Sequence, residues 1–252
     1  MKVLKYFLIS FLLINFSLSA GDLKWYSYKE GVELAKKEKK LLLIDFYTDW
    51  CGWCKKMDKT VYTDQEVIEL LNKYFIAVKL NPEKDDPVTY QGETYEAGQF
   101  ARATGLKGYP ATAFFTSEVE FIYLVPGYQN KDRFLGLLDY FSSGNYTKVG
   151  FEDYLIFTEI DKKQKAEPQD ADLNFVVDFF YHKILNENEK AESYYKNSVK
   201  QNSEFAEAYA LLAEVSTGKN SKDYLKEAQK LGYKNEEEVL EKVKSILTTH
   251  LN

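Results

Sequence analysis

The residues best suited to covalent chemistry are two cysteines, which lie in the segment Trp50-Cys51-Gly52-Trp53-Cys54. This segment directly follows an apolar, strand-like run and opens a predicted helix. A thiol in the first turn of a helix faces unpaired backbone N–H groups and the positive end of the helix dipole, and both favour the thiolate. The thiolate is the nucleophile of disulfide exchange, and a second cysteine three residues later can resolve the mixed disulfide. The spacing predicts a redox-active pair in which an exposed Cys51 attacks and a shielded Cys54 resolves.

Three other roles of a cysteine pair are less compatible with this sequence. A structural disulfide across two intervening residues closes so small a loop that the chain-entropy model assigns it little stabilisation. Covalent haem attachment needs a histidine after the second cysteine, where this chain has Lys55. A closed Cys/His zinc site needs four ligands, and the only histidines are His182 and His250. We therefore expect neither a metal nor another cofactor.

Length and composition limit the class of protein. The chain has 252 residues, enough for one large domain or two ordinary ones. Apolar residues make up 45% and charged residues 29%, which is the balance of a soluble globular protein. The 39 acidic residues outnumber the 33 basic ones, so the net charge is -6. A general nucleic-acid binder gains affinity by neutralising phosphates, so no nucleic-acid partner is expected.

The first 20 residues have the layout of a secretory signal peptide. Lys2 and Lys5 precede an apolar run from Tyr6 to Phe16, and small residues follow as far as Ser19 and Ala20. The alternative is an uncleaved membrane anchor, but a spanning helix needs about 20 apolar residues. We expect cleavage near Ser19 or Ala20 and export of a mature protein without stable membrane insertion. Its location is the periplasm if the source is bacterial.

Residues 21–145 alternate strand-like and helix-like segments, which predicts an α/β domain with a mixed central sheet flanked by helices. Capping boxes predict helix starts at Ser27 to Glu30 and at Thr63 to Glu66. Asn130 is the expected cap of the last helix. The polar stretch from Pro82 to Gly92 interrupts the pattern and is predicted to be a loop. Strands are expected near Trp25 and at Leu41 to Tyr47, Phe75 to Leu80, Ala111 to Thr116 and Glu120 to Val125.

Residues 146–252 have a helical period throughout. The segments Tyr194-Tyr195-Lys196 and Tyr224-Leu225-Lys226 recur at a spacing of 30 residues. This weakly resembles tetratricopeptide-type helix pairs, whose usual period is about 34 residues. We expect an all-helical C-terminal region without chemistry of its own, which either positions a partner or substrate or stabilises the first domain as a cap.

Over about residues 22–145 the chain resembles the thioredoxin-fold family, on four motifs that occur in the family's order. The family's strand and redox motif is similar to Asp45-Phe46-Tyr47-Thr48-Asp49-Trp50-Cys51-Gly52-Trp53-Cys54-Lys55. Its strand with a lysine that pairs with the buried acid is similar to Val78-Lys79-Leu80-Asn81. Its cis-proline loop is similar to Gly108-Tyr109-Pro110-Ala111-Thr112, and a glycine of its last strand corresponds to Gly127. Two features depart from the family. Trp53 replaces the proline typical of cytosolic thioredoxins, and residues 82–92 resemble an insertion.

The resemblance implies a role for residues around the cysteine pair. Asp45 falls at the position of the family's buried acid, where desolvation raises the pKa and lets the carboxyl relay the Cys54 proton. The alternative is a structural ion pair between Asp45 and Lys79. The implied catalytic residues are Cys51, Cys54, Asp45 and Lys79, and the implied substrate-binding residues are Trp50, Gly52, Trp53, Tyr109 and Pro110, with Pro110 expected in the cis form.

The resemblance also implies a function, an exported thiol-disulfide oxidoreductase. Its partners are protein thiols and disulfides and an unidentified thiol-disulfide electron donor. A reducing role is favoured because Asp45 and Lys79 are thioredoxin-like and no histidine lies between the cysteines to stabilise a thiolate strongly. One alternative is a disulfide isomerase, which the aromatic Trp53 favours. Another is a non-enzymatic interaction protein that binds partners through its helical region, although the intact cysteines, Asp45 and Pro110 weigh against it.

Overall fold

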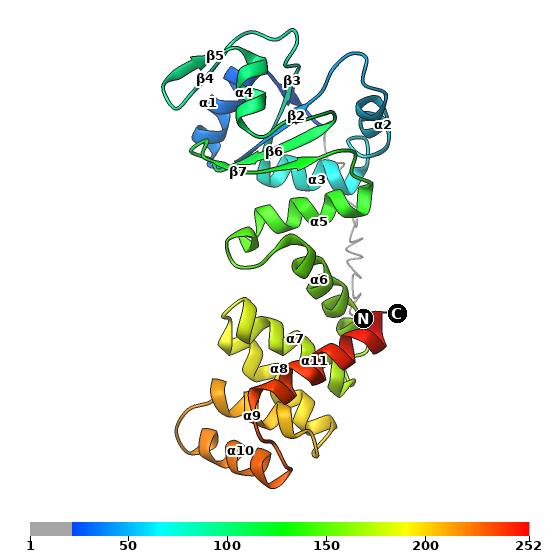
Figure 1. Cartoon of the computed structure of the whole chain (residues 1–252), viewed down its shortest axis with the longest axis vertical. Coiled ribbons are helices and arrows are strands. Elements are labelled where there is room, and N and C mark those ends of the chain that lie inside the picture. Colours follow the sequence, from blue (N-terminus) through cyan, green and yellow to red (C-terminus); the bar gives the residue numbers. More distant parts are fainter. Residues whose placement is uncertain (1–21, 252) are drawn as a thin grey trace, which may run out of the picture. The chain divides into compact units, whose positions relative to one another are not determined.

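The computed structural model describes residues 22–251, which form two compact units (Figure 1). The first unit ends at Lys131, and the second begins at Asp132. The expected signal peptide, residues 1–20, lies outside the described residues. Within residues 22–251, no helix combines the length and the apolar character that crossing a membrane requires.

The first unit is built on a five-stranded mixed sheet with the strand order β1-β3-β2-β6-β7. Strands β1, β3 and β2 pair in parallel, and β6 runs antiparallel to both β2 and β7. This is a thioredoxin fold, which confirms the predicted fold class. The strands are β1 (Trp25–Tyr26), β2 (Leu41–Phe46), β3 (Phe75–Leu80), β6 (Ala111–Phe115) and β7 (Phe121–Pro126).

Four helices of the first unit accompany the sheet: α1 (Tyr28–Glu38), α2 (Gly52–Thr60), α3 (Gln65–Tyr74) and α4 (Ala97–Ala103). The predicted capping box at the start of α1 is confirmed, because Ser27 accepts from the Glu30 backbone N–H while the Glu30 carboxylate accepts from the Ser27 backbone N–H. Gly31 lets α1 lie close to β3, since a Cβ there would come within 2.1 Å of the Val78 side chain.

The second predicted capping box, Thr63 to Glu66, is wrong by one residue. Asp64 is the N-cap of α3, and its carboxylate accepts from the backbone N–H groups of Glu66 and Val67. Thr63 instead donates its hydroxyl to the Lys59 carbonyl oxygen at 2.8 Å. A carboxylate at the N-cap accepts hydrogen bonds from the first backbone N–H groups, and its negative charge is stabilised by the positive end of the helix dipole. Asp64 is therefore a stronger cap than the adjacent Thr63.

The two faces of the sheet have different chemistry. Leu42, Ile44 and Phe46 of β2 point into an apolar core that also includes residues of α1 and α4. Successive side chains of a strand point to opposite faces, so Asp45 lies on the other side of the sheet. The strand register places Asp45 directly between Lys79 of β3 and Thr112 of β6. The polar side chains of Lys79, Asp45 and Thr112 therefore lie side by side on the face of the sheet opposite that core.

The prediction that Pro82 to Gly92 is a loop is wrong in its second half. Strand β4 (Val88–Tyr90) pairs with β5 (Glu93–Tyr95) in a small antiparallel hairpin. The two turn residues, Gln91 and Gly92, have φ angles of 52° and 84°, as a two-residue hairpin turn of type I′ requires. Val88 is buried in the core with α1 and α4. Strands of three residues are too short to show a periodic pattern.

The second unit is helical throughout its described residues, as predicted for the C-terminal region (Figure 1). Phe175 and Phe205 pack with ring centroids 4.6 Å apart, and Tyr195 is fully buried beside Phe175. The repeat-like organisation stays a prediction. The elements are α5 (Lys131–Ser142), η1 (Asn145–Thr147), α6 (Phe151–Ala166), α7 (Ala171–Phe179), the π-helix η2 (Phe180–Ile184), α8 (Asn188–Gln201), α9 (Ala206–Val215), α10 (Gly218–Lys230) and α11 (Glu236–Leu251).

Candidate functional site

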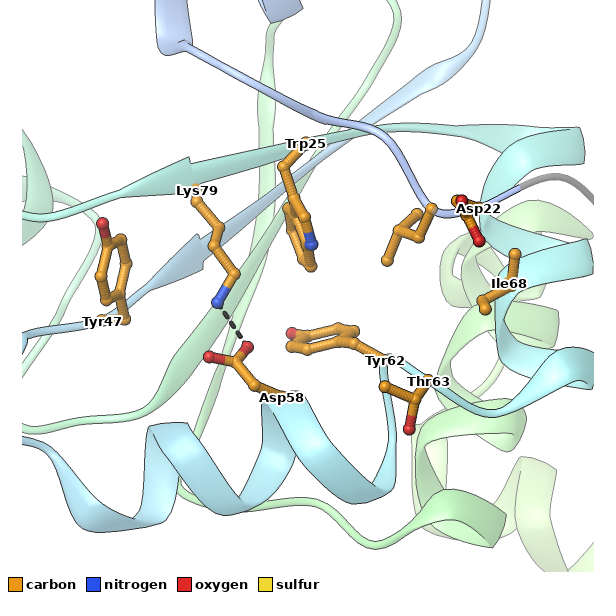
Figure 2. Close-up of a pocket in the computed structure, with 9 residues that line it drawn as sticks. Asp22, Trp25, Tyr47, Asp58, Tyr62, Thr63, Ile68 and Lys79 are labelled. Atoms are coloured by element: carbon orange, nitrogen blue, oxygen red, sulfur yellow. Dashed lines mark hydrogen bonds and ion pairs between the residues drawn. The ribbon is translucent and has the colours of Figure 1, made fainter.

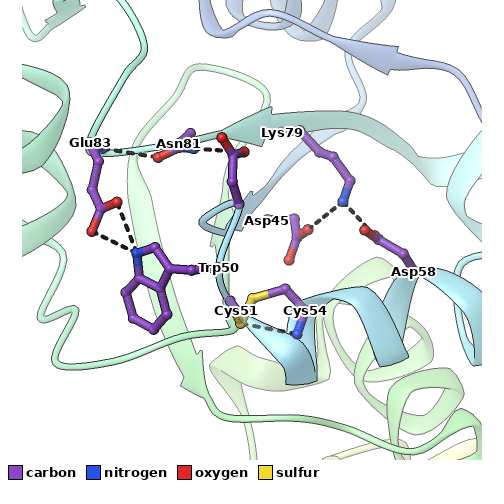
Figure 3. Close-up of a disulfide and its surroundings, with 9 residues drawn as sticks. Asp45, Trp50, Cys51, Cys54, Asp58, Lys79, Asn81 and Glu83 are labelled. Atoms are coloured by element: carbon purple, nitrogen blue, oxygen red, sulfur yellow. Dashed lines mark hydrogen bonds and ion pairs between the residues drawn. A yellow bond between two sulfur atoms is a disulfide. The ribbon is translucent and has the colours of Figure 1, made fainter.

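Cys51 and Cys54 form a disulfide at the start of α2 (Figure 3). Cys51 is the N-cap of this nine-residue helix, and its sulfur accepts a hydrogen bond from the Cys54 backbone N–H at 3.0 Å. The cysteine sulfur therefore already lies where the helix N-terminus stabilises negative charge.

The prediction of an exposed Cys51 and a shielded Cys54 is wrong for this disulfide state. Cys51 is 4% exposed and Cys54 is 3% exposed. The bond holds the Cys51 sulfur over the first turn of α2, next to the sulfur of the cysteine inside the helix.

Asp45 lies near the disulfide and forms the ion pair with Lys79 that the sequence analysis gives as its alternative role (Figure 3). The Lys79 Nζ lies 3.2 Å from Asp45 Oδ2, and the Asp45 side chain is only 2% exposed. Burial raises the pKa of Asp45 to about 6, although Lys79 acts in the opposite direction. Smaller effects come from Asp58, which raises this pKa, and Tyr62, which lowers it. The carboxyl can therefore gain or lose a proton near neutral pH.

A second carboxylate, Asp58, was not predicted from the sequence. Its Oδ1 contacts Lys79 Nζ, so the lysine is shared between Asp58 and Asp45 (Figure 3). Asp58 lies on α2 four residues after Cys54, and residues at this spacing share one face of a helix. That spacing is the sequence signal for Asp58, because the face of α2 that presents Cys54 to the sheet also presents Asp58.

The Lys79 side of this network opens into a pocket of about 560 Å³ (Figure 2). Lys79 and Asp58 line it together with Trp25, Tyr47 and Tyr62. The Lys79 ammonium lies 4.9 Å from the ring centres of both Trp25 and Tyr47 and 5.7 Å from that of Tyr62. The aromatic rings hold the cation by their electron-rich faces, while the pocket gives Lys79 and Asp58 contact with solvent. Lys79 therefore contacts both the buried Asp45 carboxylate and the solvent in the pocket.

Exposed aromatic side chains flank the disulfide. Trp50 is 67% exposed and Trp53 is 56% exposed, so neither serves as core packing. The Trp50 ring packs edge-on against Tyr109, with centroids 5.9 Å apart, and the Trp53 ring lies 5.3 Å from that of Tyr128. Gly52, between the two cysteines, is exposed, and a Cβ at this position would meet no other atom.

The loop before β6 contains the expected cis peptide bond, between Tyr109 and Pro110. The Pro110 carbonyl oxygen accepts from the Gly127 backbone N–H at 2.8 Å, which ties this loop to the end of β7. The structure therefore brings Tyr109 to Trp50, and Trp50 to the cysteines, as the predicted site requires.

Residues 28–142 match the family model described as a thioredoxin-like domain. This part of the chain has the thioredoxin fold and is similar to thioredoxin-like domains. The match includes both cysteines, Asp45, Lys79 and Pro110.

Curated relatives share shorter stretches with this chain. An uncharacterized protein of Archaeoglobus fulgidus is 35% identical over 63 residues, which are 25% of this chain and 50% of that protein. A protein named disulfide bond reductase DsbH, from Chlamydia pneumoniae, is 34% identical over 65 residues, or 25% of this chain and 36% of that protein. The match therefore spans half or less of the length of each of these relatives.

Two solved structures resemble the thioredoxin-like domain. A structure titled DsbH oxidoreductase is 21% identical with a TM-score of 0.40 and covers 49% of this chain and 86% of its own. A putative disulphide-isomerase from Bacteroides thetaiotaomicron is 28% identical with a TM-score of 0.39 and covers 47% of this chain and 89% of its own.

Proposed function

We propose that the protein is an exported thiol-disulfide oxidoreductase that reduces disulfides in other proteins. The observation that supports this most directly is the Cys51–Cys54 disulfide at the N-terminus of α2, near a buried Asp45 whose pKa is raised to about 6. A purely structural disulfide needs no titratable carboxyl beneath it, whereas a dithiol that gives up protons during exchange needs an acceptor.

The reaction starts from the dithiol. The Cys51 thiolate attacks one sulfur of a substrate disulfide, which forms a mixed disulfide and releases the first substrate thiolate. Cys54 then loses its proton to the Asp45 carboxylate and attacks the Cys51 sulfur, which releases the second substrate thiolate and forms the Cys51–Cys54 disulfide. Two electrons pass to the substrate, and its thiolates take up two protons. A dithiol electron donor then reduces the Cys51–Cys54 disulfide for the next cycle.

The remaining site residues position the substrate in this proposal. Trp50 and Trp53 offer apolar surface on the two sides of the disulfide. The backbone beside the cis Tyr109–Pro110 bond pairs with an extended substrate segment, and Gly52 leaves the sulfurs accessible because it has no side chain. Lys79 and Asp58 exchange the Asp45 proton with solvent through the pocket.

The direction of electron flow is tested by the reduction potential of the purified protein. A reductant requires a potential near that of thioredoxin, about -270 mV, whereas a strong oxidant lies near about -120 mV. Equilibration with glutathione buffers, followed by thiol alkylation and mass spectrometry, measures it. A potential of about -180 mV, the value of protein disulfide isomerase, favours the alternative function of an isomerase.

The proposed function also requires export of the protein and a division of the chain into domains. We propose that residues 1–20 are a signal peptide, that residues 21–145 form the thioredoxin-like domain and that residues 146–252 form a helical region that positions the partner. The basic, apolar and small-residue order of residues 1–20 supports export, to the periplasm if the source is bacterial. Mass spectrometry of the protein isolated from its own cells tests this: a mature chain that begins near Gly21 supports export, and an intact Met1 contradicts cleavage.

A further inference from the structure

An exposed tryptophan beside the disulfide is fixed by a residue from the inserted segment. The Trp50 indole Nε1–H donates to the Glu83 carboxylate, with distances of 3.0 Å to Oε2 and 3.3 Å to Oε1 (Figure 3). Glu83 lies in the stretch that leads from β3 to the β4–β5 hairpin, outside the sheet of the thioredoxin fold. The indole of Trp50, a residue that is 67% exposed, thus has a hydrogen-bond partner on the protein itself.

The position of Glu83 is itself fixed by the chain. The Asn81 side chain accepts from the Glu83 backbone N–H at 3.0 Å and donates to the Asp49 carboxylate at 3.4 Å. Lys84 pairs with the same Asp49 carboxylate. Because Asp49 directly precedes Trp50, these contacts tie the inserted segment to the segment that enters the active site.

The two sides of the disulfide differ in charge. Glu83 lies close enough to Tyr109 that its negative charge, after burial, raises the pKa of the Tyr109 hydroxyl, whereas Arg102 lowers it. Trp50 and Tyr109 thus form an aromatic wall with the Glu83 carboxylate on the Trp50 side and the Arg102 cation acting on Tyr109. On the Trp53 side, the Lys56 ammonium lies 4.7 Å from the Trp53 ring centre and 4.9 Å from that of Tyr128. That second wall is aromatic and basic.

We infer that Glu83 is a positioning residue that determines substrate specificity, because it fixes Trp50 as one wall of the docking surface and gives that wall a negative charge. The favoured occupant is an extended protein segment with an apolar side chain next to its cysteine and a lysine or arginine beyond it, on the Trp50 side. A carboxylate that accepts one indole N–H keeps further lone pairs for such a base. The inference rests on the proposed function, since the segment must bring a cysteine to the Cys51–Cys54 pair.

The test uses the full chain in its disulfide form and two peptides in which serine replaces the reactive cysteine. Both peptides carry leucine beside that serine, and they differ only in arginine or glutamate beyond the leucine. Binding is followed by NMR through the Trp50 indole N–H signal, which a Trp50→Phe variant assigns. We expect the arginine peptide to bind the unsubstituted protein about threefold to fivefold more tightly, the range of an exposed ion pair.

Two Glu83 variants separate charge from orientation. Glu83→Gln keeps an acceptor for the indole, so it should abolish the preference for arginine and leave the binding of the glutamate peptide no weaker. Glu83→Ala also releases the indole, so it should weaken both peptides and shift the Trp50 indole signal. Asp86→Asn is the matched control, because Asp86 is an exposed acid of the same inserted segment, and it should leave the preference intact.

An equal preference for arginine in Glu83→Gln and in the unsubstituted protein would overturn the inference, as would equal binding of both peptides to the unsubstituted protein. Turnover of a small disulfide is measured in parallel. If neither the unsubstituted protein nor any variant converts the small disulfide to its thiols, the proposed function fails. Peptide binding needs no redox step, so it still decides the role of Glu83. Equal turnover in Asp86→Asn and in the unsubstituted protein, with the peptide preference lost in Glu83→Gln, is the expected result.

Discussion

Each of the two units buries one aspartate, and the two differ in what surrounds the carboxyl. Asp45 of the first unit is 2% exposed and lies between Lys79 and Thr112 in the sheet. Asp178 of the helical unit, on α7, is fully buried, and neither of its oxygens has a hydrogen-bond partner among the described side chains and backbone. Burial alone raises the pKa of Asp178 to about 10, whereas Lys79 limits the rise at Asp45 to about 6.

The difference shows which surroundings let a buried carboxyl take up and release a proton near neutral pH. Asp178 remains protonated at every pH near neutrality, so its proton does not exchange in a working cycle. Asp45 has a cation within 3.2 Å, and this places its titration where proton transfer to and from a thiol is possible. We therefore expect changes at Asp45 to alter turnover and changes at Asp178 to alter stability.

The largest expected effect is the loss of turnover in Asp45→Asn. An amide cannot take the Cys54 proton, so reduction of a protein disulfide at pH 7 should slow by about 100-fold. Asp178→Asn, the matched substitution in the other unit, should leave the rate unchanged. Initial rates across pH 5 to 9 measure both. Equal rates for Asp45→Asn and the unsubstituted protein at every pH would leave Asp45 only its structural ion pair with Lys79.

The same substitution in the helical unit should raise its stability. The folded pKa of Asp178 lies above its unfolded value of 3.8, so its contribution is present at low pH and is lost as pH rises from about 4 toward about 10. Across this window stability should fall by about 1.4 kcal/mol per pH unit. Asp178→Asn removes this slope and should stabilise the unit at pH 7 by about 2 kcal/mol, since the buried amide retains part of the desolvation cost.

Urea unfolding can assign these changes to the correct unit. All three tryptophans, Trp25, Trp50 and Trp53, lie in the first unit, so their fluorescence reports on it, whereas far-UV circular dichroism is dominated by the helices of the second. Asp178→Asn should move only the dichroism transition. A fluorescence transition that shifts by the same amount would contradict the assignment.

Removing the cation should make Asp45 more like Asp178. Lys79→Met takes away the charge that lowers the Asp45 pKa, so the carboxyl should titrate above pH 6. The carboxyl carbon signal of Asp45 in NMR measures the midpoint directly. A midpoint at or below that of the unsubstituted protein would show that Lys79 does not stabilise the ionised form.

The smallest expected effect has the opposite sign. Asp58 raises the Asp45 pKa, so Asp58→Asn should lower the midpoint. The change should be modest, because the Asp58 side chain is 40% exposed and solvent screens its charge. The same NMR titration measures it, with Asp64→Asn as a control on the neighbouring helix. An upward shift in Asp58→Asn would exclude the shared-lysine network.

Much of this site could be predicted from the sequence, because its main elements are local. The cysteine spacing and the single acid in an apolar strand are each recognised within a few residues, and the Asp45–Lys79 pair is implied by the resemblance to the thioredoxin-fold family. The role of Asp58 was not predicted, because its contact with Lys79 depends on how α2 packs against the sheet. The hairpin was not predicted because its strands have three residues each.

The position of the Cys51 sulfur was predicted only in part. Its place at the helix N-terminus is a local property of the chain and is confirmed. Its predicted exposure is wrong, because both cysteines are buried in the Cys51–Cys54 disulfide, and a sequence pattern does not specify whether that bond is present.

The central claim is that Cys51 attacks a substrate disulfide and Cys54 resolves the mixed disulfide, and paired trapping variants test it most directly. Reduced Cys54→Ser and Cys51→Ser proteins are each incubated with a protein that contains disulfides, and the adducts are separated without reductant and identified by mass spectrometry. We predict that Cys54→Ser accumulates a mixed disulfide through Cys51, because no second thiol is present to release it, and that Cys51→Ser accumulates little. Trapping by Cys51→Ser alone would reverse the two roles, and no adduct with either variant would contradict disulfide exchange as the function of this site.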